Sequence, residues 1–212
     1  MKKLGLTLIF ILSVFVLIAQ DVVKIKHTNY TTHFSKSKRY PVMVEWVTTR
    51  TMIGCPTPLK RKDNFKPDPQ LPVESNIGEH YVKSGYDRGH VMPAAENLCQ
   101  TPAVQDECFY FTNMIPQPHR LNAGDWKSLE TAERDWAYST GEVKVWAGAV
   151  GETKKVGPIS IPEKCWKVIY IKNTNQWLAF VFNNDLSAPN GYADNAVSKE
   201  AVEKLSGFKF IP

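Results

Sequence analysis

Several segments rich in strand-forming residues constrain the fold of this 212-residue chain most strongly. Residues 143–150, 166–171 and 177–182 are dominated by valine, isoleucine and aromatic side chains, which favour β-strands. In residues 42–47, one set of side chains alternates with another, a pattern typical of a strand with one well-buried face. The first set is Val42, Val44 and Trp46, and the second is Met43, Glu45 and Val47. A shorter aromatic run at 109–113 predicts another strand. The chain therefore contains enough strands for a substantial sheet.

Helical patterns occur separately from these strands. Residues 125–138 place four apolar side chains on one side of a predicted helix, and we expect them in the core: Trp126, Leu129, Ala132 and Trp136. Residues 198–205 predict a second helix that ends before Gly207. Because strands and helices do not alternate as regular βαβ units, the sequence predicts an α+β fold.

Residues 54–76 predict a long loop. Five prolines interrupt regular strand pairing there: Pro56, Pro58, Pro67, Pro69 and Pro72. Four basic residues give the segment positive charge: Lys60, Arg61, Lys62 and Lys66. This loop is either a solvated surface segment or a rim that contacts phosphate groups.

The first 19 residues resemble an export signal. Lys2 and Lys3 precede an apolar run over residues 4–18, and the small residue Ala19 follows it. The run is shorter than the roughly 20 residues of a spanning helix, so stable membrane association is not expected. We expect removal of residues 1–19 and a single domain over residues 20–212, exported to the periplasm or secreted. The formal net charge of +5 is too small to imply a strongly basic nucleic-acid coat.

Four cysteines follow the predicted signal, and an even number in an exported chain favours two disulfides. Three pairings are possible. The favoured pairing joins Cys99 with Cys108, which closes a short loop, and leaves Cys55 with Cys165. The spacing contains no C-x-x-C pair, which argues against a zinc cluster or a thioredoxin-like site.

Three blocks of polar residues carry the candidate chemistry, at residues 85–90, 112–117 and 122–130. His90 has an ordinary pKa of about 6.5 and can accept a proton near neutral pH. Arg88 stays charged and can stabilise developing negative charge. Gly89 between them allows the backbone to lie close to another group. Together these residues indicate attack on a phosphate.

Hydrolysis of a phosphodiester also needs a counter-charge and help for the leaving oxygen, which a metal ion supplies. Mg²⁺ prefers oxygen ligands and keeps several waters, so the amide oxygen of Asn122 could be a ligand and Glu130 could act through a metal-bound water. On one ideal helix, residues eight positions apart differ by about 80° and about 12 Å along the axis. A break at Gly124 would allow Asn122 to fold back toward the site.

These blocks resemble those of the DNA/RNA non-specific endonucleases, the ββα-metal nucleases that include secreted bacterial sugar-non-specific nucleases and mitochondrial endonuclease G. The similarity covers about a third of the chain in ordered blocks, and its residues are Phe65, Asp68, Tyr81, Ser84, Asp87, Arg88, Gly89, His90, Asn113, Pro116, Gln117, Asn122, Trp126, Leu129, Glu130 and Arg134. The resemblance implies a ββα-metal nuclease fold, with a central antiparallel sheet flanked by helices. It implies cleavage of both DNA and RNA to 5′-phosphate products.

The resemblance also implies residue roles. His90 would be the general base, Asn122 the sole direct protein ligand of Mg²⁺, and Glu130 a carboxylate outside the ligand shell. Arg88 and Arg134 would contact phosphate. Supporting roles fall to further residues. Asp87 and Gln117 would hold the geometry of the motif, and Asn113 would steady His90 or the waters of the ion. Arg61 or Lys62 would replace an arginine that some relatives carry where this chain has Asp63.

Several alternatives stay open at this level. Mn²⁺ or another divalent cation could replace Mg²⁺, and the oligomeric state is not determined. The chain could instead be an inactive nucleic-acid-binding or inhibitor protein on the same scaffold, or a phosphodiesterase of small esters. The remaining histidines are expected to be structural or surface residues: His27, His33, His80 and His119.

Overall fold

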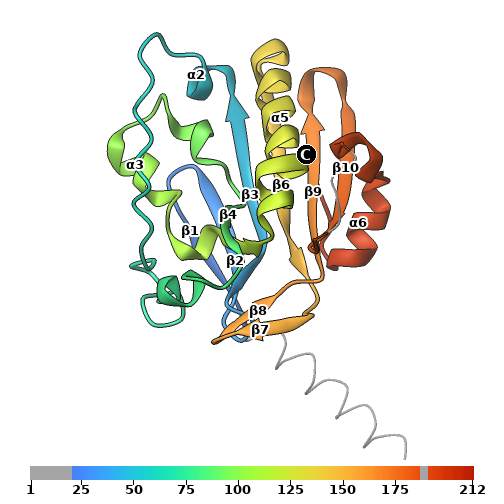
Figure 1. Ribbon diagram of the computed structural model, residues 1–212. Helices are drawn as coiled ribbons and strands as arrows, with labels where there is room; N and C mark the ends of the chain where they lie inside the picture. The colour runs from blue at the N-terminus through green and yellow to red at the C-terminus, as the bar shows by residue number, and fades with distance from the viewer. Residues whose placement is uncertain (1–20, 187–190) are drawn as a thin grey trace, which may run out of the picture.

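The computed structural model describes residues 21–186 and 191–212, so the predicted signal lies outside the described residues. A seven-stranded sheet forms the centre of the molecule, with every neighbouring pair antiparallel (Figure 1). Across the sheet the order is β1 (Val22–Lys26), β2 (Tyr30–Ser35), β3 (Tyr40–Thr49), β6 (Glu142–Val150), β9 (Lys164–Ile171), β10 (Gln176–Asn183) and β11 (Ala196–Val197). The predicted strands at 42–47, 143–150, 166–171 and 177–182 are confirmed.

Helices cover both faces of this sheet, because its central strands bury side chains on both sides. On β6, Val145 and Ala147 belong to the main hydrophobic core, whereas Trp146 belongs to a second cluster. Helix α5 (Lys127–Thr140) packs into the main core through Leu129, and α6 (Lys199–Ser206) packs into the second cluster. Figure 1 shows α5 lying along the central strands. The α+β prediction, with a central antiparallel sheet flanked by helices, is confirmed.

The three sequence blocks form a hairpin followed by a helix. Strand β4 (Asp87–His90) pairs antiparallel with β5 (Met114–Gln117). The chain then enters α4 (His119–Leu121), a π-helical turn η4 (Asn122–Trp126), and α5. Ile115 of β5 and Trp126 of η4 are both buried in the main core, so the hairpin and the helix are held against the same face of the sheet. This is the ββα arrangement that the resemblance implies.

The predicted strand at 109–113 is wrong. Phe111–Asn113 forms a 3-10 turn, η3, and the strand begins at Met114. The side chain of Thr112 donates to Asp68 at 2.5 Å, and that of Asn113 bonds to the backbone of Met92. These contacts hold the segment in a turn and override its local preference for a strand.

The two predicted helices are confirmed, with a later start for the first, at Lys127. The second begins after Ser198, whose hydroxyl accepts from the backbone N–H of Ala201, and Gly207 closes it with a φ of +77°. Short elements complete the described fold: α2 (Arg50–Ile53), η1 (Gly78–Tyr81), η2 (Ala94–Asn97), α3 (Pro102–Glu107), β7 (Lys154–Val156), β8 (Ile159–Ile161), η5 (Lys172–Thr174) and η6 (Tyr192–Asn195). None of the described helices has the length and apolar character needed to span a membrane.

The predicted loop at 54–76 is confirmed as turns and irregular backbone, and it runs down one edge of the molecule past α3 (Figure 1). A disulfide ties its start to the segment after η2, through Cys55 and Cys99. The predicted pairs of Cys99 with Cys108 and of Cys55 with Cys165 are therefore wrong. Cys108 and Cys165 are free and buried. The backbone N–H of Leu59 donates to Leu98 at 2.6 Å, and this local docking brings Cys55 to Cys99.

Candidate active site

His90 lies at the end of β4 with its ring enclosed by aromatic residues. The side chain is largely buried, with its ring centroid 5.0 Å from that of Phe109 and 5.5 Å from that of Phe65. The indole N–H of Trp126 donates to the carbonyl of His90 at 3.0 Å and fixes the backbone at this point. Neither ring nitrogen of His90 forms a hydrogen bond with a described residue, and Nε2 is a buried atom without a partner. The ring is therefore held by packing while its nitrogens stay unused.

The surroundings of His90 keep its imidazole neutral. Burial, together with the charges of Arg61 and Arg88, lowers its pKa from 6.5 to about 3, against an opposing effect of Asp63. A neutral imidazole carries one nitrogen that can accept a proton. His90 therefore has the protonation state of a general base across the neutral range.

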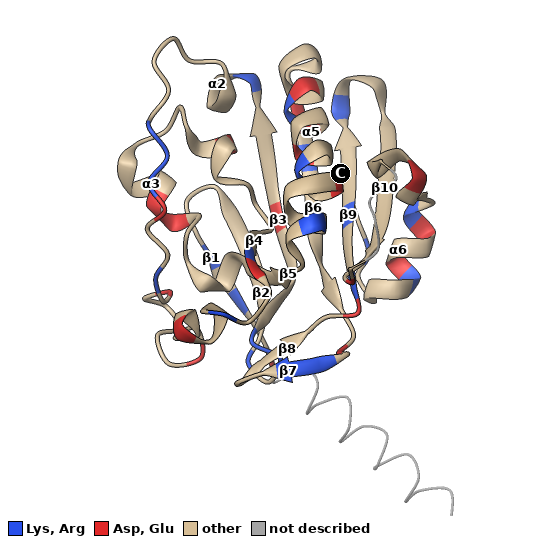
Figure 2. Cartoon of the chain, in the orientation of Figure 1, with Lys and Arg blue, Asp and Glu red and all other residues tan. Residues whose placement is uncertain are grey.

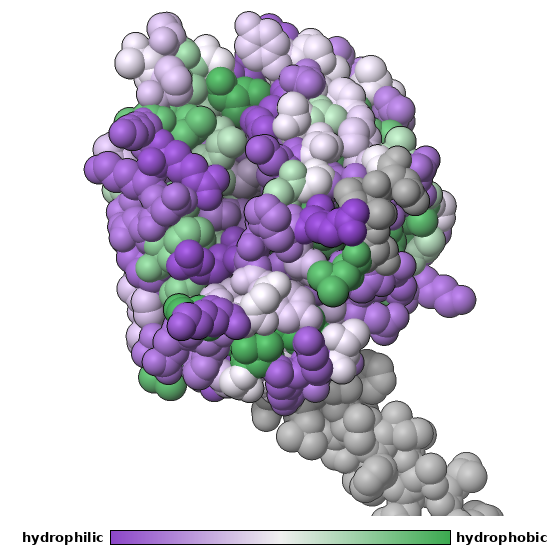
Figure 3. Space-filling view, in the orientation of Figure 1, coloured by the Kyte–Doolittle hydropathy of each residue, from purple (hydrophilic) through white to green (hydrophobic). Residues whose placement is uncertain are grey.

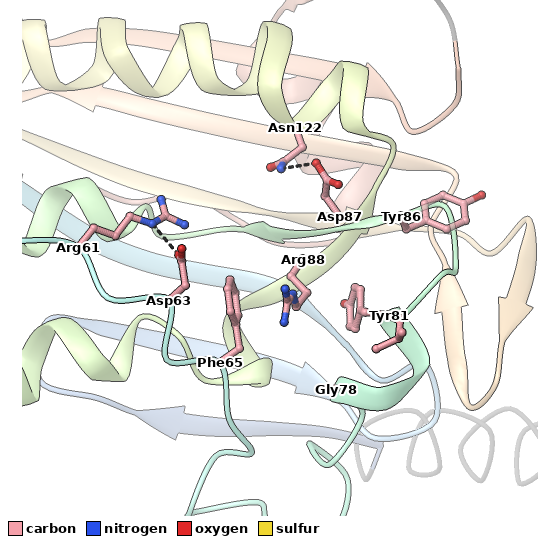
Figure 4. Close-up of a pocket in the computed structure, with 10 residues that line it drawn as sticks. Arg61, Asp63, Phe65, Gly78, Tyr81, Tyr86, Asp87, Arg88 and Asn122 are labelled. Atoms are coloured by element: carbon pink, nitrogen blue, oxygen red, sulfur yellow. Dashed lines mark hydrogen bonds and ion pairs between the residues drawn. The ribbon is translucent and has the colours of Figure 1, made fainter.

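Asn122 is oriented by a carboxylate. Its amide Nδ2 donates to Asp87 Oδ2 at 2.9 Å, and His119 Nδ1 lies 2.8 Å from the same oxygen. Figure 4 shows the contact between Asn122 and Asp87 at the edge of a cavity. Because the amide nitrogen is engaged, the amide oxygen is the atom left for a ligand. Asp87 therefore fixes which end of the Asn122 amide is available.

A backbone break brings Asn122 and Glu130 to one cavity. Gly124 has φ −100° and ψ −112°, outside the helical region, so Asn122 and Glu130 do not lie on one continuous helix. Both residues line the cavity that His90 also lines, which has a volume of about 310 Å³. The expectation that the helix breaks at Gly124 is confirmed.

Glu130 is the carboxylate of this cavity. Burial raises its pKa from 4.5 to about 7, although the positive charges of Lys167 and Arg134 favour its ionised form. Glu133, one turn further along α5, adds to the rise. Glu130 thus titrates near neutral pH, so a cation placed beside it would draw it into the ionised form.

Four cations line the same cavity: Arg61, Arg88, Lys127 and Arg134. The guanidinium of Arg88 lies 4.1 Å from the ring centroid of Phe65, and Arg61 pairs with Asp63 at 2.9 Å. Arg134 donates to Thr131 through Nη2, while its buried Nη1 has no partner among the described residues. These cations suit a phosphate ligand.

Two of the predicted residues are buried and support the β4–β5 hairpin and the segment after it. The side chain of Asn113 is fully buried and bonds to the backbone of Met92 and Cys108, so it steadies the segment that follows His90. Gln117 is fully buried opposite Asp87 in the hairpin. A Cβ atom on Gly89 would lie 2.0 Å from Gln117 Oε1, so a larger residue there would displace the buried side chain of Gln117.

The arrangement fits a lightly held divalent cation. Among residues 21–186 and 191–212, no group of three or more His, Cys, Asp or Glu side chains could form a metal cage. Asn122 offers one oriented amide oxygen, and Glu130 lines the same cavity. Mg²⁺ keeps several waters and is often held by few protein oxygens together with substrate phosphates. The residues present therefore fit Mg²⁺ or Mn²⁺ at Asn122.

Sequence reasoning missed two residues of this site. Lys127 lines the cavity, and His119, expected to have no special context, contacts the carboxylate that orients Asn122. The position of His119 in the sequence could have indicated this contact, because it lies after β5 and three residues before Asn122. Of the basic loop residues, Arg61 lines the cavity, whereas Lys66 pairs with Asp106 at 3.3 Å.

The sequence is similar to those of known nucleases. The model of the DNA/RNA non-specific endonuclease family matches residues 13–212. The mitochondrial nuclease EXOG of Danio rerio is 32% identical over 211 residues, which cover 88% of this chain and 60% of that protein. A nuclease of Nostoc sp. is 28% identical over 199 residues, which cover 86% of this chain and 70% of that protein.

The fold has a solved counterpart. The crystal structure of the EndoG/EndoGI complex superposes with a TM-score of 0.79 at 25% sequence identity, covering 88% of this chain and 84% of that one. The chain spans 58% of the length of the mitochondrial nuclease EXOG of Xenopus laevis, to which it is 29% identical over 209 residues that cover 88% of this chain.

Proposed function

The chain belongs to the DNA/RNA non-specific endonuclease family, and we propose that it is an exported, Mg²⁺-dependent endonuclease that hydrolyses phosphodiester bonds of DNA and RNA without strong sequence preference. One observation carries the proposal: His90, Asn122 and Glu130 line a single cavity together with four cations. A scaffold that only binds nucleic acid would need the cations but none of these three side chains.

The residues divide the work of hydrolysis. His90 takes the proton of the attacking water at a ring nitrogen, because its imidazole is neutral and unbonded. Arg88 and Arg134 hold the phosphate and offset the charge that grows on its oxygens, with Arg61 as a further phosphate contact. Asn113 and Gln117 keep the hairpin in place beneath the reacting atoms.

Asn122 Oδ1 is the proposed metal ligand, with Glu130 acting through a water. A divalent cation bound there supplies a counter-charge to the phosphate and assists the departing oxygen. Glu130, when ionised, would orient that water or take up its proton. Asp87 contributes by holding the amide nitrogen, which keeps the amide oxygen directed to the cavity.

Export is part of the same proposal. Residues 1–19 have the composition of a signal, and we propose a single nuclease domain over residues 20–212 after their removal. The disulfide between Cys55 and Cys99 supports a periplasmic or secreted location, because such bonds persist in oxidising compartments.

The proposed substrate is nucleic acid, a polyanion that binds through its phosphates. The face of the molecule in Figure 3 is mostly hydrophilic, with hydrophobic residues in small separate patches. Figure 2 shows acidic and basic residues interspersed along the elements. Affinity for phosphate is therefore expected from the local group of cations in the cavity and not from a uniformly basic surface.

Digestion of plasmid DNA and of RNA tests the proposal. We expect cutting of both with Mg²⁺, loss of cutting with EDTA, and a loss of about 10²–10⁴-fold in His90→Ala. His33→Gln, a substitution on β2 outside the cavity, is the matched control and should cut normally. Binding of nucleic acid without cutting would favour the inactive-scaffold alternative, and turnover of small diesters alone would favour a phosphodiesterase.

A further inference from the structure

A charged pair is buried beneath the helix that carries Glu130. Lys167 of β9 and Glu133 of α5 are both fully buried, and Lys167 Nζ lies 2.9 Å from Glu133 Oε2. The steps of hydrolysis proposed above use neither residue. A buried ion pair often contributes less to stability than apolar side chains of similar volume would. Stability is therefore a weak reason for this pair, and its other contacts indicate a different one.

Lys167 contacts the residue that supports His90. Its ammonium lies 4.8 Å from the ring centroid of Trp126, which is within the range of a cation–π contact. The indole N–H of Trp126 in turn donates to the carbonyl of His90 at 3.0 Å. Two successive contacts in the interior therefore connect the ammonium on β9 to the end of β4, where His90 lies.

Glu133 connects the same ammonium to the opposite side of the cavity. It lies on α5 one turn after Glu130 and directly before Arg134, and both of these residues line the cavity. Because side chains on one helix move together with its backbone, a contact that holds Glu133 also holds Glu130 and Arg134. Although burial raises the pKa of Glu130, the charge of Lys167 lowers it, so the ammonium also acts on Glu130 through space.

The remaining neighbours tie the pair to the sheet. The indole N–H of Trp46, on β3, donates to Glu133 at 3.2 Å and to Glu96 at 3.0 Å, and the Trp46 ring centroid lies 5.5 Å from Lys167 Nζ. Thr48 donates to the same oxygen of Glu96. Burial raises the pKa of Glu96 well above its usual value, and the charge of Glu133 adds to the rise, so Glu96 favours its neutral form. Glu133 is thus bonded to two strands of the sheet, β3 and β9.

We propose that Lys167 and Glu133 are positioning residues that fix α5 relative to the end of β4, so that Glu130 and His90 face one phosphate. The inference rests on the proposed endonuclease function. A displacement of about 1 Å between reacting groups can lower a rate about 10²-fold. Binding of phosphate by cations is less sensitive, because charge interactions weaken gradually with distance. Loss of the pair should therefore lower kcat much more than it raises KM.

A neutral replacement of the pair separates position from stability. Lys167→Met with Glu133→Met replaces both charges by apolar side chains of similar length, whereas Lys167→Met alone leaves a buried carboxylate without its cation. We expect the double variant to melt within about 5 °C of the wild-type protein, and the single variant to melt at a lower temperature than either. With single-stranded DNA and Mg²⁺, the double variant should nevertheless have a kcat at least about tenfold lower, with KM within about twofold.

A surface pair provides the matched control. Lys172 Nζ lies 2.8 Å from Glu142 Oε1, and both side chains are exposed, so Lys172→Met with Glu142→Met should keep the wild-type kcat. Crystal structures of the two double variants give a readout that does not depend on activity. The separation between the His90 ring and the Glu130 carboxyl should differ from that of the wild-type protein only when the buried pair is replaced.

Three results for the variant without the buried pair would overturn the inference while leaving the endonuclease proposal standing. The first is a stable protein with the wild-type kcat. The second is an unchanged separation between His90 and Glu130. The third is a protein that does not fold, because the pair would then serve stability and not position. Absence of cutting by the wild-type protein would remove both proposals.

Discussion

Burial acts in opposite directions on the two titratable side chains of the cavity. It lowers the pKa of His90 to about 3 and raises that of Glu130 to about 7. In both cases the apolar surroundings disfavour the charged form. The same environment therefore gives a histidine that is ready to accept a proton and a carboxylate whose charge depends on a nearby cation. Residues whose pKa values are separated in this way often share acid–base work.

The raised pKa of Glu130 predicts a pH dependence of stability in the metal-free protein. A carboxyl whose pKa is about 7 when folded and near 4.5 when unfolded binds its proton more tightly in the folded state. The stabilisation is complete below pH 4.5 and is lost as the pH rises toward 7. We expect the free energy of unfolding of Glu130→Gln to fall by about 1–2 kcal/mol less than that of the wild-type protein over this pH range. This figure allows for solvent in the cavity.

Denaturant unfolding in EDTA between about pH 3.5 and about pH 8 is the measurement, since about one pH unit beyond each pKa brackets the transition. Glu107→Gln, at an exposed contact with Thr28, is a control that retains the slope of the wild-type protein. Identical slopes in Glu130→Gln and the wild-type protein would contradict the raised pKa.

At this scale, residue types and order predicted which side chains share the cavity. His90, Asn122, Glu130, Arg88, Arg134 and Arg61 all line it. The contacts that orient them were less predictable. Asp87 accepts from Asn122 and His119 only because a hairpin and a kinked helix bring these residues together. Asn113 sits in the middle of a sequence block, but its bonds go to backbone groups.

At the scale of elements, the long strands were predicted because β6, β9 and β10 are continuous runs of strand-forming residues. The short strands β4 and β5 have no such pattern, since their four-residue sequences contain polar residues or proline. Their pairing depends on the core that Ile115 enters. The disulfide was predicted wrongly for a similar reason: pairing follows the docking of the 54–76 loop, which is a tertiary contact.

The disulfide is expected to stabilise this loop and the site it borders. Cys55 and Cys99 close a loop with a sequence separation of 44 residues. We expect Cys55→Ser with Cys99→Ser to lower the free energy of unfolding by about 2–4 kcal/mol. Because the tethered loop carries Arg61 to the cavity, KM for nucleic acid should also rise.

Melting temperatures with and without dithiothreitol provide the check. The wild-type protein should lose stability on reduction, whereas the double variant should not respond, which makes it an internal control. If the oxidised wild-type protein and the double variant melt at the same temperature, the disulfide has no part in holding the fold.

At the scale of the whole molecule, phosphate binding is local and not a property of net charge. The formal net charge is only +5, yet four cations converge on one cavity. Each phosphate contact of a single strand contributes about 0.7 to the slope of log affinity against log salt. Arg134→Gln should therefore reduce that slope by about 0.7 for single-stranded DNA.

Fluorescence anisotropy of a labelled oligonucleotide over a salt series measures this slope. Lys172→Gln removes the same charge from an exposed residue that pairs with Glu142, so it is the matched control and should keep the wild-type slope. Equal slopes in the two variants would indicate that net charge, and not the cavity, governs binding.

The most direct test of the account is a crystal structure of His90→Ala with Mn²⁺ and a short single-stranded oligonucleotide. The account predicts one anomalous peak about 2.0–2.2 Å from Asn122 Oδ1, sharing a phosphate whose opposite side faces the position vacated by the imidazole. An ion bound away from Asn122, or a phosphate that does not lie between the ion and residue 90, would contradict it.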